Sequence, residues 1–378
     1  MGAVSQSYIQ ELYGGRLSLS ASQIDRLANC RMHYFLRYGL HAKENKAITV
    51  DPAEFGTYVH AVLEECGRTI ASMGGFKKVS LEETLRIAKE SSERYYEERF
   101  AQISSQRLSY HFQKNTKELE WIVKELWNEM QQSSFEAVDF ELGFGEGEKL
   151  PAIQICDGDL SAQLGGFVDR VDLWRNNGDI FLRVIDYKTG AKEIDYCDIF
   201  NGIGLQMLLY LYALEENAES LYEGKPVISG VEYFPARVPF LLAEGALTQD
   251  EAEADRRKAF IREGLLLSEE NVLYAMENTD EPVRLPYKRK ADGTLVGNIA
   301  SRNQFAKLKK YIFSYLKKMV LDVASGNITP NPYTRGSSHN ACKYCPYGSI
   351  CMRDEIRERR NYQAMKQDRF WEEVEKEV

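Results

Sequence analysis

The sequence lacks any run of about 20 consecutive apolar residues, the length that a membrane-spanning helix requires. Its longest mostly apolar stretch, residues 202–214, is interrupted by Gln206. The N-terminus also lacks a basic segment followed by an apolar one, which is the pattern of a secretory signal. We therefore expect a soluble protein with no membrane partner and, by default, a cytoplasmic location.

Proline is scarce, with 10 residues among 378, while 44% of the residues are hydrophobic and 28% are charged. This composition is typical of globular proteins and excludes a collagen-like or wholly disordered chain. The length predicts two to three compact units of ~150 residues each. The sequence contains no internal repeat and no G-x-x-x-x-G-K-[ST] loop, so we do not expect the chain itself to hydrolyse ATP.

The seven cysteines are an odd number, which argues against a disulfide framework. Three of them, Cys342, Cys345 and Cys351, lie within ten residues as C-x2-C-x5-C. Such crowding indicates ligation of a metal ion or cluster. Three of the other four, Cys66, Cys156 and Cys197, are expected to be packing or incidental thiols.

The net charge of -9 argues weakly against a polyanionic partner. Residues 284–318 nevertheless carry ten basic residues against one acidic residue, and aromatic residues are interleaved with them. Phosphate attraction combined with base stacking is how proteins hold single-stranded nucleic acid, so this stretch is a candidate DNA contact. The alternative is the solvated face of an amphipathic helix.

Apolar periodicity predicts a helical first part followed by a strand-rich middle. Helices are expected at 21–38, from 57 onward, and at 81–103, 116–133, 204–216 and 301–324, with a charged helical insert at 250–263. Strands are expected at 137–144, 152–156, 160–174, 180–187 and 227–234, and residues 176–179 predict a tight hairpin. The corresponding segments are an N-terminal helix (1–45), a helical region (46–135), a core (136–242), an insert with the basic helix (243–330) and a cysteine-rich end (331–378).

The hairpin places Asp169 on one strand and Asp186 with Lys188 on the next. Because residues i and i+2 of a strand share a face, Asp186 and Lys188 point the same way. Two carboxylates and an ammonium would bind a hard divalent cation and assist phosphodiester hydrolysis. The alternative is a surface ladder of Asp and Lys residues with no catalytic role.

Four motifs occur in this order along the chain: F-G-T-x-x-H, G-x-x-D-R-x-D, I-D-Y-K-T-G and Q-x-x-x-Y. A fifth feature is the single Cys30 far upstream of the cysteine cluster. Together they resemble the RecB-type branch of the PD-(D/E)xK nuclease superfamily, in particular AddB-type helicase-nuclease subunits with a 4Fe-4S cluster. The resemblance implies an α/β (α+β) fold with a restriction-endonuclease-like core. A central mixed sheet would be flanked by helices and extended by helical inserts. An iron-sulfur cluster would join the two ends of the chain as a staple.

The same resemblance assigns roles to residues of this chain. His60, Asp169, Asp186 and the Tyr187 carbonyl would bind Mg2+ or Mn2+, with Lys188 as the catalytic lysine. Gln206 and Tyr210 would position the DNA strand. Glu64 and Glu141 are weaker metal candidates, and Asp172, expected on the opposite sheet face, should pair with Arg170 or a helix.

Cys30, Cys342, Cys345 and Cys351 would hold the 4Fe-4S cluster, although a zinc site or reduced thiols remain physical alternatives. The implied activity is exonucleolytic hydrolysis of one strand at DNA ends, in double-strand break repair with an AddA-type partner and no small-molecule substrate. Rival interpretations are a non-catalytic iron-sulfur module that binds DNA ends, a stand-alone nuclease like the CRISPR adaptation enzymes, and a helical scaffold with a zinc knuckle.

Overall fold

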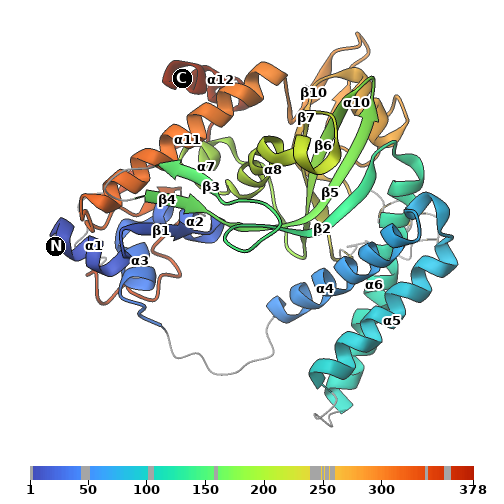
Figure 1. Ribbon diagram of the computed structural model, residues 1–378, viewed down its shortest axis with the longest axis horizontal. Coiled ribbons are helices and arrows are strands. Elements are labelled where there is room, and N and C mark those ends of the chain that lie inside the picture. Colours follow the sequence, from blue (N-terminus) through green and yellow to red (C-terminus); the bar gives the residue numbers. More distant parts are fainter. Residues whose placement is uncertain are drawn as a thin grey trace.

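The computed structural model describes residues 3–43, 52–100, 106–156, 161–238, 260–336, 339–352 and 359–378, with 248, 251 and 255. A central sheet separates a three-helix arm from a second group of elements, which combines both ends of the chain (Figure 1). The insert expected at 250–263 lies largely outside the described residues. No helix among the described residues is long and apolar enough to cross a membrane.

The central sheet has six strands in the order β11-β8-β7-β6-β5-β2. Its strands are β2 (Glu136–Phe144), β5 (Gly166–Asn176), β6 (Asp179–Lys188), β7 (Lys225–Pro235), β8 (Glu263–Leu267) and β11 (Ile299–Ala300). β6 pairs with β7 in parallel, whereas β5 pairs with both β2 and β6 in antiparallel fashion. The sheet is therefore mixed, as expected, and β8 and β11 extend it beyond residue 242.

The hairpin between β5 and β6 confirms the prediction for residues 176–179. Asn176 pairs with Asp179, so the loop has two residues, Asn177 and Gly178. Both have positive φ, 51° and 85°. This conformation matches the twist of the flanking strands and explains why Asn-Gly stands there. The strand expected at 160–174 is divided at Gly165 into β4 (Ser161–Leu164) and β5.

Two helical layers cover the sheet. α8 (Gln206–Tyr222) packs on one face, and α4 (Pro52–Ser72), α5 (Leu81–Phe100) and α6 (Gln106–Gln132) form the arm on the other. The expected apolar stripe of α4 is buried. α4 approaches β2 closely at Gly67, where an added Cβ would lie 2.1 Å from the Phe140 ring.

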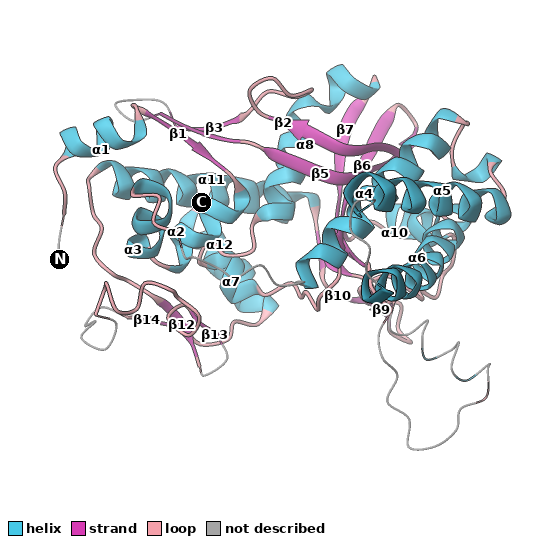
Figure 2. Ribbon diagram, turned by 90° about the horizontal axis from the view of Figure 1, so that it is seen from below, coloured by secondary structure: helices cyan, strands magenta, loops and turns pink. Residues whose placement is uncertain are grey.

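The N-terminal and C-terminal elements lie together on the far side of the sheet from the arm (Figure 2). They include α1 (Gln6–Tyr13), α2 (Ala21–Asn29), α3 (Arg31–Tyr34), α7 (Tyr196–Phe200), α11 (Arg302–Ala324) and α12 (Gln367–Glu377). Smaller pieces are α10 (Glu270–Glu277), β1 (Arg16–Leu19), β3 (Ile153–Cys156), β9 (Tyr287–Arg289), β10 (Leu295–Gly297), β12 (Tyr333–Arg335), β13 (His339–Asn340) and β14 (Arg360–Asn361).

The prediction of one continuous helix at 21–38 is wrong, because the chain is extended at Cys30 between α2 and α3. The Ser20 and Gln23 capping box is present as predicted. The interruption is stabilised from a distance: the Arg31 amide donates to the Asn331 side chain at 2.9 Å, and Arg360 donates to the Asn29 carbonyl at 3.3 Å. A π-helical turn, Phe35–Gly39, follows α3, and the Leu40 amide donates to the Phe35 carbonyl five residues back.

Candidate active site

The central residues of the site lie where β6 ends and β5 begins. Asp169 on β5 accepts a hydrogen bond from the Tyr187 amide of β6 at 2.8 Å. Asp186 is 2% exposed, and one of its oxygens lies 2.5 Å from the Lys188 ammonium. The hairpin thus brings together the two carboxylates and the lysine, as the sequence predicted.

His60 reaches this group from α4, across the sheet end. Its Nε2 lies 2.7 Å from the Tyr187 carbonyl oxygen, and its Nδ1 lies 3.3 Å from Asp169 Oδ2. Burial lowers the pKa of His60, although the Tyr187 carbonyl and Asp186 oppose the shift. A neutral ring that donates from Nε2 turns an unprotonated Nδ1 toward the Asp169 oxygen, so two acceptors face each other.

Glu141 on β2 joins the same cluster. One ligand atom each of His60, Glu141 and Asp169 lies within 4.8 Å of the others. Glu141 has a φ of 47°, a left-handed conformation that is uncommon for a residue with a side chain and often occurs at functional sites. Glu64, the other weak candidate, instead pairs with Arg68 at 2.9 Å. The positive φ explains why alternation along the strand could not place Glu141.

The electrostatics of this cluster favour a cation. Burial raises the pKa of Asp169 well above its usual range, and Asp186 and Glu141 add to the shift. Burial also raises the pKa of Asp186, against the opposing charge of Lys188. Buried carboxylates that repel one another and face an imidazole nitrogen are a donor set for a divalent ion, because its charge offsets both the burial and the repulsion.

Gln206 and Tyr210 lie on one face of α8, and the Gln206 amide donates to the Tyr210 hydroxyl at 3.3 Å. Burial raises the pKa of Tyr210 to about 12, so its hydroxyl stays protonated and can donate. Gly166 at the start of β5 makes room for this ring, since an added Cβ would lie 2.7 Å from the Tyr210 oxygen. Both predicted positioning residues therefore face the end of the sheet that carries Asp169.

Asp172 pairs with Arg170, as predicted, through hydrogen bonds of 2.7 and 2.9 Å. It belongs to a buried network on the face toward α6 that the sequence analysis did not identify. The network contains three guanidinium groups and three carboxylates: Arg170, Arg183, Arg262, Glu129, Asp172 and Glu232. An arginine within the apolar strand sequence FLRVI was the available signal, because a buried cation requires partners.

The cysteine-rich end folds back onto the start of the chain. Cys30, Cys345 and Cys351 pack against a small apolar cluster of Met32, Phe35, Leu36 and Tyr347. The Cys342 thiol has a raised pKa, caused by burial and by the neighbouring thiols of the other three cysteines. Residues about 310 positions apart are thus brought together. Cys66 and Cys197 are buried away from this group, whereas the Cys156 side chain lies outside the described residues.

His33, three residues after Cys30, also reaches this group, which the sequence analysis missed. Its Nδ1 lies 3.7 Å from the Cys345 sulfur, and its ring meets Tyr347 edge-on at 5.3 Å. Burial lowers the pKa of His33 to about 4. A neutral imidazole is therefore in place beside one thiol.

The basic stretch differs from expectation in two ways. Tyr287, Phe305 and Tyr311 are buried, so their rings cannot stack on bases. Several of its cations also have acidic partners within the chain, as the pairs Lys307 with Glu375, Lys309 with Glu215, Lys318 with Glu377 and Arg302 with Glu269 show. Much of the local positive charge is offset by α12 and α8.

Comparison with known proteins agrees with this geometry. The family model of the PD-(D/E)XK nuclease superfamily matches residues 18–352. One subunit of an ATP-dependent helicase/deoxyribonuclease from Acetivibrio thermocellus is 31% identical over 97% of this chain and 33% of that protein. Proteins of the same name from Clostridium novyi (31% identical) and Thermoanaerobacter sp. (30%) match over 99% of this chain and 34% and 33% of their own lengths.

The chain therefore spans about a third of the length of the curated relatives that it matches. The matched region includes all the site residues described above, from His60 to Tyr210, and the four clustered cysteines. This chain belongs to the PD-(D/E)XK nuclease superfamily.

Proposed function

We propose that this chain is a divalent-metal-dependent deoxyribonuclease domain that hydrolyses one strand at DNA ends. The observation that carries the proposal is the meeting of Asp169, Asp186, Lys188 and His60 at one end of the sheet, within a chain of a nuclease superfamily. A surface ladder without catalytic purpose would not bury Asp186 to 2% exposure.

The donor set supports Mg2+ or Mn2+ as the ion. Asp169, Asp186, His60 and the Tyr187 carbonyl would hold it, and Glu141 is close enough to contribute directly or through a water. Carboxylate and carbonyl oxygens are the ligands that hard divalent ions prefer. A bound divalent ion would lower the pKa of its water and offset negative charge on the phosphoryl oxygens.

The remaining groups have roles that follow from where they lie. Lys188 adjoins Asp186 and supplies a positive charge beside the position of the attacked phosphate, where it would orient the water or stabilise the developing charge. Tyr210 and Gln206 present a hydroxyl and an amide that would hold the DNA strand across the sheet end. The protonated Tyr210 hydroxyl can donate to a phosphate oxygen.

We further propose a 4Fe-4S cluster on Cys30, Cys342, Cys345 and Cys351. Burial and the other three thiols raise the pKa of Cys342, and ligation to iron would remove that penalty. One distant cysteine with a C-x2-C-x5-C cluster differs from the two C-x2-C knuckles of a usual zinc ribbon, which favours the iron-sulfur cluster. The cluster would tie α2 and α3 to the cysteine-rich end.

The relatives are named as subunits of an ATP-dependent helicase/deoxyribonuclease, which supports action on DNA within a helicase-nuclease. The motor would be a separate, AddA-type partner, acting with this domain in double-strand break repair and recombination. The described cysteines form no disulfide, which fits a reducing compartment, so we place this action in the cytoplasm.

The test is cleavage of end-labelled single- and double-stranded linear DNA by the anaerobically purified chain, in Mg2+ or Mn2+ and in chelator. Asp186→Asn should abolish cleavage. Asp179→Asn is the matched control, because Asp179 lies at the opposite end of the same strand. Cleavage that survives in Asp186→Asn would contradict the assigned catalytic site. A folded wild-type chain that binds DNA ends without cutting them would contradict the nuclease proposal and favour a binding module.

A further inference from the structure

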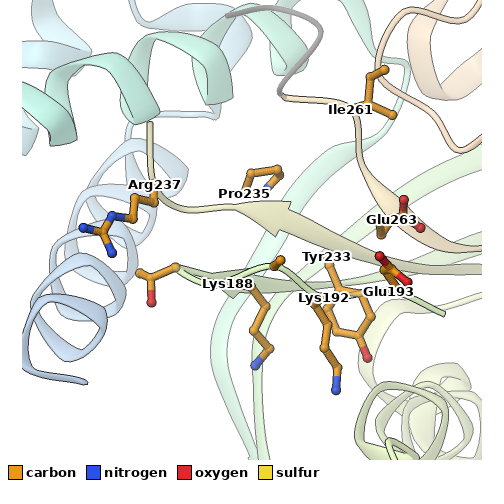
Figure 3. Close-up of a pocket in the computed structure, with 11 residues that line it drawn as sticks. Lys188, Lys192, Glu193, Tyr233, Pro235, Arg237, Ile261 and Glu263 are labelled. Atoms are coloured by element: carbon orange, nitrogen blue, oxygen red, sulfur yellow. The ribbon is translucent and has the colours of Figure 1, made fainter. Parts of the chain in front are cut away.

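A pocket of about 380 Å³ opens beside the candidate active site, at the carboxyl ends of β6 and β7 (Figure 3). Lys188 lines this pocket as well as belonging to the site. Pro235, another lining residue, lies opposite Lys188 in the parallel ladder. The loop 189–193, Tyr233, Arg237 and residues 261 and 263 complete the lining. Its volume falls within the range of about 300–1,000 Å³ typical of small-ligand pockets.

Lys192 gives this pocket an available positive charge. Its side chain is exposed and points the same way as that of Lys188, beside the Tyr233 ring (Figure 3). The ammonium lies 5.9 Å from the centroid of that ring. No carboxylate of the described residues lies within 4.0 Å of the Lys192 ammonium, whereas Asp186 already pairs with Lys188.

The opposite end of the pocket is acidic. Glu193 and Glu263 lie there side by side, away from the two lysines (Figure 3). Arg237, which also lines the pocket, points away from its centre and lies 3.8 Å from Glu118. A phosphate would therefore be attracted to the lysine end and repelled from the other, whereas amino groups of a base could donate to the carboxylates.

We propose that this pocket binds the nucleotide next to the scissile phosphate, with Lys192 contacting the phosphate of that nucleotide. The inference rests on the proposed nuclease function and names a contact for its substrate. Pro235 and Ile261 supply apolar surface for the sugar or base, and Ile261 is 46% exposed. Lys192 is thus a binding residue beside the catalytic group.

The test measures binding of a fluorescein-labelled single-stranded oligonucleotide of 12 thymidines by anisotropy, without divalent metal, at several salt concentrations. Lys192→Ala should reduce the slope of log affinity against log salt by about 0.7, the value for one single-strand phosphate contact. Over the tenfold range from 1 M to 0.1 M salt, this change in slope corresponds to a loss of about 5-fold in affinity at 0.1 M salt. Lys192→Arg should restore both quantities.

Lys225→Ala is the matched control, since Lys225 is exposed and lies at the end of β7 opposite to Pro235 and the pocket. Cleavage in Mn2+ is measured on the same proteins, and Lys192→Ala should raise KM with little change in kcat. A Lys192→Ala protein that cleaves and binds like wild type, with an unchanged salt slope, overturns the pocket assignment alone. If Lys192→Ala changes the salt slope of binding as expected but wild-type protein never cleaves, the nuclease proposal is overturned and the phosphate contact remains supported.

Discussion

Replacing Asp172 with Asn should destabilise the fold strongly. Asp172 accepts hydrogen bonds from Arg170 and from Arg183, whose Nη2 lies 2.7 Å from Asp172 Oδ2. All three side chains are buried, with exposed fractions of 0–1%. The surrounding network has equal numbers of positive and negative groups, so losing one carboxylate leaves an uncompensated buried charge. Breaking a buried pair in this way costs about 3–5 kcal/mol.

The assay is chemical denaturation of wild type, Asp172→Asn and the control Glu83→Ala, which removes an exposed pair with Arg86. The control should leave the unfolding midpoint unchanged. Asp172→Asn should still cleave DNA at temperatures where it is folded, because Asp172 faces α6 and not the metal ligands. A loss of stability no larger than about 1 kcal/mol, the average for point mutants, would refute the assigned role of the network.

The same network predicts acid sensitivity. Burial alone would raise the pKa of Glu129, but Arg262, Arg170 and Arg183 hold it well below its usual range. A carboxyl with a lowered pKa in the folded state contributes stability above its unfolded pKa, about 4.5, and loses that contribution as the pH falls. The contribution of Glu129 to the free energy of unfolding should therefore be lost in acid, and Glu129→Gln should show a shallower dependence on pH than wild type in this range. An unchanged slope would contradict this.

Two further substitutions test other parts of the structure. Gly166→Ala places a Cβ 2.7 Å from the Tyr210 hydroxyl and should displace that ring, slowing DNA cleavage while the Lys225→Ala control cleaves normally; full activity would show that Tyr210 need not stay in place. Cys345→Ser should lower both the iron content and the thermal midpoint of anaerobically purified protein, because the proposed cluster would link segments about 310 residues apart. An unchanged midpoint would argue against the staple.

The sequence was most informative where local rules decide the structure. The Asn177 and Gly178 turn follows from the positive φ that both residues tolerate, and it sets the register that brings Asp169 to Asp186. The apolar stripe of α4 follows from the helical period of its apolar residues, so His60 could be placed on a neighbouring face of that helix.

The parts that could not be predicted depend on contacts between distant segments. Cys30 interrupts a helix because Asn331 and Arg360 supply partners about 300 residues away. Glu141 joins the site because its φ is positive, which no alternation pattern shows. Three lysines of α11, Lys307, Lys309 and Lys318, pair with glutamates on α12 and α8, and that pairing appears only when the helices are packed.

The proposed mechanism assigns metal binding and catalysis to different residues, so both should be measured on one sample. We would titrate Mn2+ into wild type, Lys188→Met and Asp186→Asn, and then time single-turnover cleavage of a labelled strand. Lys188→Met should bind Mn2+ at least as tightly as wild type, because it removes a competing charge from Asp186, yet cleave at least about 100-fold more slowly. Asp186→Asn should lose both properties. A Lys188→Met protein that cleaves at the wild-type rate would contradict the proposed role of the lysine.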